Sequence, residues 1–199
     1  MSSLIQRDFF FKKLVEINDL KLFKEWFFYN GMLFNRSEKW WGRVGNRPSQ
    51  HEGIDIGFYK DTNNTIQPLK SPVRIPVVAD GIVVEISDDD LLGNSIFIRH
   101  EIFDKDKKVL HSVYAHSTPA DELEVNDRVE KGFIIGSVTD ISSRDLMISA
   151  HLHMSMIWLT ENYPNELLRW QILPDSKDAV LADPFDFLDC RYSNNNYQP

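Results

Sequence analysis

The residue pattern from about residue 73 onward constrains the fold most, because short runs of β-branched residues alternate there with turn residues. Runs rich in Val and Ile are typical of strands. Pairs such as Gly93-Asn94 and Asn126-Asp127 supply the turns between them. We therefore predict a mainly β fold, an antiparallel sheet or open sandwich, with strands at residues 73–78, 81–86, 95–100, 109–116, 133–139 and 151–158.

The two ends of the chain have a different character. Residues 4–28 are predicted to be helical, because Phe10, Leu14 and Ile17 follow the i, i+4, i+7 spacing of an apolar helix face. Asn18-Asp19 would divide this region into two helices. We expect a helical segment over residues 1–35, a domain over residues 36–190 and a flexible, Asn-rich tail over residues 191–199.

Composition limits the partners and the location. Charged residues interrupt the apolar ones in residues 4–28, so neither the ~7–15-residue apolar core of a signal peptide nor a ~20-residue membrane span is present. This pattern predicts a cytoplasmic protein without a transmembrane segment. The net charge is −8 and no Lys/Arg cluster exists, so nucleic acid is not an expected partner. The aromatic N-terminal segment is predicted to cap the domain; contact with a partner or membrane is the alternative.

Three separated clusters carry the residues that bind metals and move protons. Neutral imidazole and carboxylate are ligands that Zn²⁺ prefers, and a catalytic zinc uses three of them beside an open position. Four histidines and one aspartate exceed that number by two, so two histidines would be free to act on a substrate. The clusters are His51-x-x-x-Asp55, Tyr114-x-His116 and His151-x-His153.

The expected strands place these clusters. Alternate residues of a strand share a face, so His151 and His153 point the same way, and by the same rule Tyr114 and His116 share a face. In a straight strand the Cα atoms of residues 51 and 55 would lie roughly 13 Å apart. Gly53 is therefore expected to bend the chain, with the residue before it in a loop and the aspartate at the start of a strand.

The ordered set of clusters resembles the zinc metallopeptidases of the lysostaphin and LytM type, peptidase family M23. The similarity extends over roughly residues 43–190 and beyond the clusters themselves. It includes Gly45-Asn-Arg47, Ala79-Asp-Gly-Ile-Val83, Gly93-Asn-Ser-Ile-Phe-Ile-Arg-His100, Val129-x-x-Gly-x-x-Ile-Gly136 and Asp183-Pro-x-x-x-Leu188.

The resemblance implies a lysostaphin-type fold, a zinc cofactor and roles for six residues. They are, as zinc ligands, His51, Asp55 and His153 and, as catalytic residues, His116, His151 and Tyr114. For Tyr114, which would hydrogen-bond the oxyanion, a packing role is an equal alternative. Mn²⁺ or Co²⁺ would suit the same donors. His100 is expected to be a structural histidine outside the site.

The chain also departs from the family pattern around the expected substrate groove. Residues 142–150 lack the usual Gly-Pro, and Met154-Ser155 stand where Phe-Glu is common. The connections at residues 58–75 and 160–182 are longer than usual. Loops beside a cleft commonly set what enters it, so substrate identity is the property that these departures affect.

The resulting functional hypothesis is a zinc metalloendopeptidase, a hydrolase that cuts peptidoglycan peptide cross-links with a zinc-activated water and two catalytic histidines. That substrate would place the protein in the cell envelope or outside the cell. The alternatives are a zinc peptidase for a non-wall peptide or protein, and a non-catalytic scaffold that binds peptidoglycan or regulates a partner. The N-terminal helical segment is a candidate cover for the cleft.

Overall fold

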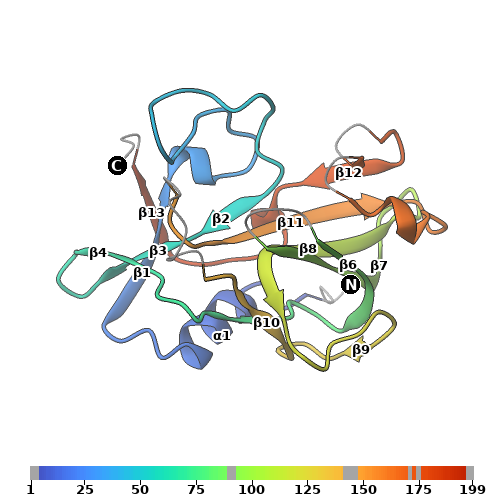
Figure 1. Ribbon diagram of the computed structural model, residues 1–199, viewed down its shortest axis with the longest axis horizontal. Helices are drawn as coiled ribbons and strands as arrows, with labels where there is room; N and C mark the ends of the chain where they lie inside the picture. The colour runs from blue at the N-terminus through green and yellow to red at the C-terminus, as the bar shows by residue number, and fades with distance from the viewer. Residues whose placement is uncertain (1–4, 89–92, 141–147, 170–171, 174–175, 196–199) are drawn as a thin grey trace.

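The computed structural model describes residues 5–88, 93–140, 148–169, 172–173 and 176–195, which form two β-sheets and one α-helix (Figure 1). The helix α1 spans Phe9–Ile17, and short 3-10 turns lie at η1 (Asn30–Met32), η2 (Asn165–Leu167) and η4 (Pro184–Asp186). The mainly β, antiparallel fold predicted from the sequence is confirmed.

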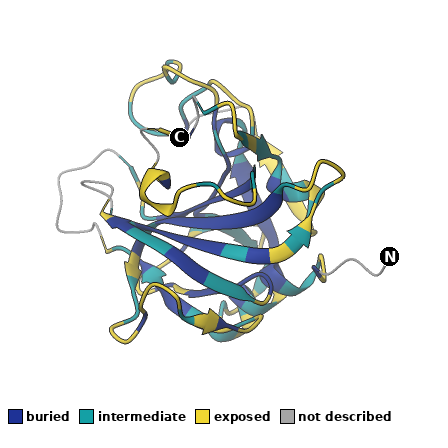
Figure 2. Cartoon of the chain, turned by 90° about the vertical axis from the view of Figure 1, so that its right-hand side faces the viewer, coloured by how far each residue is buried: buried dark blue, intermediate teal, exposed yellow. Residues whose placement is uncertain are grey.

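The larger sheet contains nine strands, all paired antiparallel, in the order β12-β11-β8-β7-β6-β9, with β2 beside β11, β10 beside β8 and β5 beside β10. All six predicted strands belong to it. They are β5 (Arg74–Pro76), β6 (Gly81–Asp88), β7 (Asn94–Phe103), β8 (Val109–Pro119), β10 (Ile134–Val138) and β11 (Leu152–Leu159). The others are β2 (Ile54–Ile56), β9 (Arg128–Val129) and β12 (Ala179–Ala182). Strands β8 and β11 are buried over most of their length, whereas β6 and β7 contain many partly exposed residues, and the loops around the sheet are mostly exposed (Figure 2).

The smaller sheet has the order β13-β1-β3-β4 and brings together segments from both ends of the described chain. Its strands are β1 (Phe23–Tyr29), β3 (Phe58–Asp61), β4 (Ile66–Pro68) and β13 (Tyr192–Asn195). The long connection at residues 58–75 thus contributes a hairpin, β3–β4, that pairs with β1.

The prediction of a helix over residues 4–28 is wrong beyond Ile17, because residues 23–29 form strand β1; residue 4 lies outside the described part of the chain. Trp26, Phe27 and Phe28 are buried in succession, so both faces of the strand are covered and no alternating pattern marks it. The chain leaves the helix through Asp19 and Leu22, which have positive φ values of 46° and 56°.

The prediction of a flexible tail is wrong for residues 192–195, which form β13 and pair in parallel with β1. The Trp26 N–H donates to the Arg191 carbonyl at 3.0 Å, and the Arg191 guanidinium donates to the Glu25 carboxylate at 3.1 Å. Residues 196–199 lie outside the described part of the chain.

Helix α1 caps the larger sheet, as the first of the two interpretations of this segment expects. Its apolar side chains Phe10, Phe11 and Leu14 are buried, and the Phe10 ring lies 6.4 Å from the ring of Tyr114 on β8. Within the described residues, no helix is both long and apolar enough to cross a membrane.

Candidate metal centre

The centre forms where the short strand β2 pairs with β11, which in turn pairs with β8. Asp55 on β2 lies directly opposite His153 on β11, and His153 lies opposite Ala115 on β8. Directly opposed residues of an antiparallel pair have their side chains on the same face. The register therefore places the carboxylate beside the imidazole, and the small Ala115 side chain leaves room next to them.

His51 reaches the same place from a loop before β2, as predicted. Its backbone N–H donates to the Arg36 carbonyl, and its own carbonyl accepts from Asn35 N–H, both at 2.9 Å. The predicted bend at Gly53 is present. A Cβ atom on Gly53 would lie 2.5 Å from Ser155 Oγ and 2.8 Å from the Met154 carbonyl carbon. Glycine is therefore required because β2 approaches the backbone of β11 so closely.

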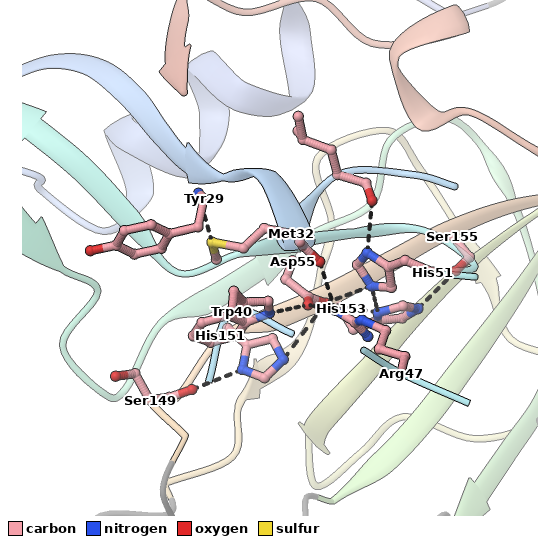
Figure 3. A network of polar contacts seen from close by, with 12 residues as sticks. Tyr29, Met32, Trp40, Arg47, His51, Asp55, Ser149, His151, His153 and Ser155 are labelled. Atoms are coloured by element: carbon pink, nitrogen blue, oxygen red, sulfur yellow. Dashed lines mark hydrogen bonds and ion pairs between the residues drawn. The ribbon is translucent and has the colours of Figure 1, made fainter. Parts of the chain in front are cut away.

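Three donor atoms of these side chains form a compact triangle (Figure 3). His51 Nε2 lies 3.0 Å from His153 Nδ1 and 3.1 Å from Asp55 Oδ1, and His153 Nδ1 lies 2.9 Å from Asp55 Oδ1. A tetrahedral Zn²⁺ with ligands at about 2.0–2.1 Å separates those ligands by about 3.3 Å. Among the described residues these three are a group that could hold a metal ion, and their spacing is close to that of a zinc site.

The hydrogen bonds behind the triangle also favour a cation. His51 Nδ1 contacts the Leu33 carbonyl at 3.1 Å, a contact that requires the ring proton on Nδ1. In the neutral ring Nε2 then carries a lone pair and faces another acceptor, Asp55 Oδ1. His153 contacts Ser155 Oγ through Nε2 at 3.0 Å, which turns Nδ1 into the triangle. Ring nitrogens of metal-binding histidines are oriented by partners of this kind. The donor set therefore fits Zn²⁺.

The second oxygen of Asp55 is held from the opposite side. Oδ2 accepts hydrogen bonds from Trp40 Nε1–H at 2.6 Å and from the Arg47 guanidinium at 3.1 Å. Burial by itself would raise the pKa of Asp55, but attraction to the protonated forms of His51 and His151 and hydrogen bonds from His153 and His51 hold the pKa well below its ordinary value. Asp55 is thus an anion with Oδ1 directed at the ring nitrogens of His51 and His153.

His151 and His116 lie beside the triangle. The ring centroid of His116 is 4.8 Å from that of His151 and 5.8 Å from that of His153. His151 donates Nδ1–H to the Ser149 carbonyl at 2.8 Å, and its Nε2 lies 3.7 Å from Asp55 Oδ1. Burial lowers the pKa of both His116 and His151, so both rings are neutral near pH 7 and able to accept a proton.

The prediction that Tyr114 and His116 share a face is wrong, because β8 contains a bulge between them. The register with β7 shifts by one residue between the Ile96–Tyr114 and Asn94–Ser117 pairs, and His116 has a φ of 58°. The extra residue turns His116 to the side of His153.

Tyr114 consequently points to the opposite face and does not join the centre. It is fully buried, and its hydroxyl accepts from the Val78 N–H at 2.9 Å. Burial raises the pKa of Tyr114 to about 12. The catalytic role suggested for Tyr114 is therefore replaced by the packing role. Because Phe10 of α1 packs on this same opposite face, α1 does not cover the centre.

Two participants were not identified as such from the sequence. Trp40 holds Asp55 from 15 positions earlier in the chain, and no spacing rule marks such a partner. The strand alternation places Ser155 on the same face as His151 and His153, but its contact with His153 Nε2 was not predicted. His100 is structural as expected, with its ring nitrogens 2.8 Å from the Asp80 carbonyl and 2.8 Å from Ser112 Oγ.

Comparison with known proteins gives one family match. A model described as "Peptidase family M23" matches residues 49–165, more than half of the 199 residues and a range that contains all five histidine and aspartate residues of the centre. No curated protein matches the chain.

Solved structures with a similar fold include three bacterial proteins. The cbpa structure from L. salivarius REN is 18% identical with a TM-score of 0.49, covering 82% of this chain and 87% of that one. The antimicrobial peptidase lysostaphin from Staphylococcus simulans is 19% identical with a TM-score of 0.43, covering 82% and 52%. A putative glycyl-glycine endopeptidase lytM from Ruminococcus gnavus is 19% identical with a TM-score of 0.42, covering 71% and 50%. The chain spans about half the length of the lysostaphin structures that it matches.

Proposed function

Because this chain belongs to peptidase family M23, we propose that it is a zinc-dependent endopeptidase that hydrolyses peptide bonds in the peptide cross-links of peptidoglycan. The observation that carries the proposal is the convergence of His51 Nε2, Asp55 Oδ1 and His153 Nδ1 within 2.9–3.1 Å of one another, with two neutral histidines beside them. Structural zinc sites use four protein ligands, so a three-ligand site flanked by two proton acceptors supports catalysis rather than structure.

We assign the zinc to His51, Asp55 and His153. Bound there, zinc supplies a Lewis acid for the peptide carbonyl and lowers the pKa of water toward about 7. The protein's part is to present these donors already oriented: His51 through the Leu33 carbonyl, and Asp55 through its second oxygen. Preorganised donors of this kind need no rearrangement when the metal or the substrate arrives.

We assign the proton transfers to His116 and His151. The Nδ1–H of His151 is committed to the Ser149 carbonyl, so its Nε2 is the atom that faces the centre and takes up a proton. With ring centroids 4.8 Å apart, the two imidazoles are close enough to act on one reacting carbonyl. One accepts the proton of the attacking water, and the pair stabilises the oxyanion and protonates the leaving amine.

The peptidoglycan substrate rests on the resemblance to lysostaphin-type enzymes. It is tested by mass spectrometry of the products released from purified peptidoglycan by zinc-loaded protein, beside a chelator-treated sample. New muropeptides that disappear on chelation are the expected result and identify the cleaved bond. Products from a casein or mixed-peptide substrate alone would instead favour a non-wall peptidase.

A His116→Ala variant separates catalysis from binding. We expect it to retain zinc and to lose about 10²–10⁴-fold in turnover, since it removes one proton-transfer group but none of the ligands. His111→Gln, which changes a buried histidine bonded to the Val109 carbonyl, serves as the control. Equal activity of His116→Ala and wild type would contradict the assignment. Absence of any hydrolysis by zinc-loaded wild-type protein would favour the scaffold function.

A further inference from the structure

Trp40 contacts both Asp55, a proposed zinc ligand, and His151, a proposed catalytic histidine. Its indole Nε1–H donates to Asp55 Oδ2 at 2.6 Å, and its ring meets the ring of His151 edge to face, with centroids 4.9 Å apart and planes at 89° (Figure 3). The side chain is 1% exposed. One rigid group thus touches a proposed zinc ligand and a proposed catalytic histidine.

We propose that Trp40 is a positioning residue that sets how Asp55 presents its carboxylate to the metal and how His151 presents its ring to the substrate. The proposal rests on the zinc peptidase function proposed above. It assigns a specific task to a residue outside the segment that the family model matches, residues 49–165.

The argument for Asp55 begins with the two oxygens of the carboxylate. A carboxylate that is free to rotate can offer either oxygen or both to a cation. Here Oδ2 is occupied by Trp40 and Arg47, so Oδ1 is left to face His51 and His153. A hydrogen bond to an ionised acceptor is short and strong, and 2.6 Å is at the short end of that range.

Arg47 alone is a weaker constraint on the carboxylate. Its nitrogen lies 3.1 Å from Oδ2 and also donates to the Gly31 carbonyl at 2.8 Å, while the guanidinium stacks on Trp41 at 4.5 Å. That nitrogen carries two N–H groups, one for each acceptor, and its distance to Oδ2 is longer than the 2.6 Å of the indole nitrogen. Loss of the indole would therefore leave Oδ2 with only the longer of its two contacts.

The argument for His151 concerns the plane of its ring. The Ser149 carbonyl accepts a hydrogen bond from Nδ1 and so fixes one end of the His151 ring. This hydrogen bond alone would still allow the plane of the ring to turn about the Nδ1–oxygen direction. Trp40 limits the rotation because it is itself held between the rings of Trp41 and Phe58, at centroid distances of 5.8 Å and 5.9 Å. The Nε2 atom is thereby kept on the side of Asp55.

Two substitutions separate these tasks in the full chain. Trp40→Phe keeps a ring but removes the N–H, and calorimetric titration of metal-free protein with Zn²⁺ should show affinity weakened 10–100-fold, the usual effect of losing a partner of a metal ligand. Trp40→Leu also removes the ring, and at saturating zinc it should lower kcat with little change in KM. Trp26→Phe, equally buried at 1% but located in the smaller sheet, is the matched control.

The outcomes are distinct. Wild-type zinc affinity in a folded Trp40→Phe protein would overturn the role toward Asp55, and an unchanged kcat of Trp40→Leu at saturating zinc would overturn the role toward His151. Failure of the wild-type protein to bind zinc would instead overturn the proposed function, and this proposal with it.

A measurement on the wild-type protein covers the case in which the variants do not fold. In ¹⁵N-labelled protein, the indole N–H signal of Trp40 should exchange slowly with solvent and shift when Zn²⁺ is added, while that of Trp26 should not shift. A Trp40 signal that is insensitive to zinc would overturn the proposal.

Discussion

Replacing Gly53 with alanine should damage the metal centre without touching any of its donor atoms. The new Cβ would clash with the Met154 carbonyl oxygen and lie 2.5 Å from Ser155 Oγ. Ordinary contact begins at 3.4 Å, so β2 must move away from β11 by at least about 0.9 Å. Because Asp55 on β2 lies opposite His153 on β11, the movement separates two donor atoms that now lie 2.9 Å apart. Overpacking of this kind costs about 1–3 kcal/mol of folding free energy, and a displacement near 1 Å can cost about 100-fold in function.

The assay combines urea unfolding of the metal-free protein with calorimetric titration of Zn²⁺. We expect Gly53→Ala to lose about 1–3 kcal/mol of stability and at least about 10-fold in zinc affinity. Gly45→Ala is the control, because its Cβ would meet only the Arg43 carbonyl oxygen, at 4.0 Å. If Gly53→Ala matched both wild type and Gly45→Ala in stability and zinc affinity, the close approach of β2 to β11 could not be what positions Asp55.

Two further predictions concern the buried His100 in the larger sheet and Ser155 beside His153. Burial lowers the pKa of His100 from 6.5 to about 4, so on this residue the unfolded chain takes up a proton before the folded one does. His100 alone should therefore remove about 3 kcal/mol of folding free energy as the pH falls from about 6.5 to 4, in addition to the losses from the other buried histidines. Urea unfolding at several pH values should show a smaller loss in His100→Gln. An identical pH dependence in the two proteins would contradict this. Ser155→Ala removes the partner of His153 Nε2 and should weaken zinc binding about 10-fold in calorimetry, and unchanged binding would show that Ser155 does not orient the ring.

Six strands of the larger sheet were predictable because each is a β-branched run between turns, whereas β2, β9 and β12 were not among the predicted runs. Strand β1 was not predictable, since Trp26, Phe27 and Phe28 are all buried and give no alternation. Its neighbour β13 is also remote: Arg191, which bonds the backbone of Trp26, lies 166 positions from Glu25. A pairing over such a distance leaves no trace in a local pattern.

Within the site, residue types and spacing predicted the loop at His51, the bend at Gly53 and the shared face of His151 and His153. The face of His116 was not predictable, because a one-residue bulge reverses the alternation that the spacing implies. The same bulge explains why Tyr114 was assigned to the site although it lies in the core.

The parallel pairing of β1 with β13 makes the order of synthesis matter for this chain. All five histidine and aspartate residues of the centre are made before Tyr192, so until then β1 is paired only with β3 and its other edge is open. An open edge on an aromatic strand invites pairing with other chains. Until residues 192–195 are made, this edge of β1 is therefore a place where aggregation can compete with folding.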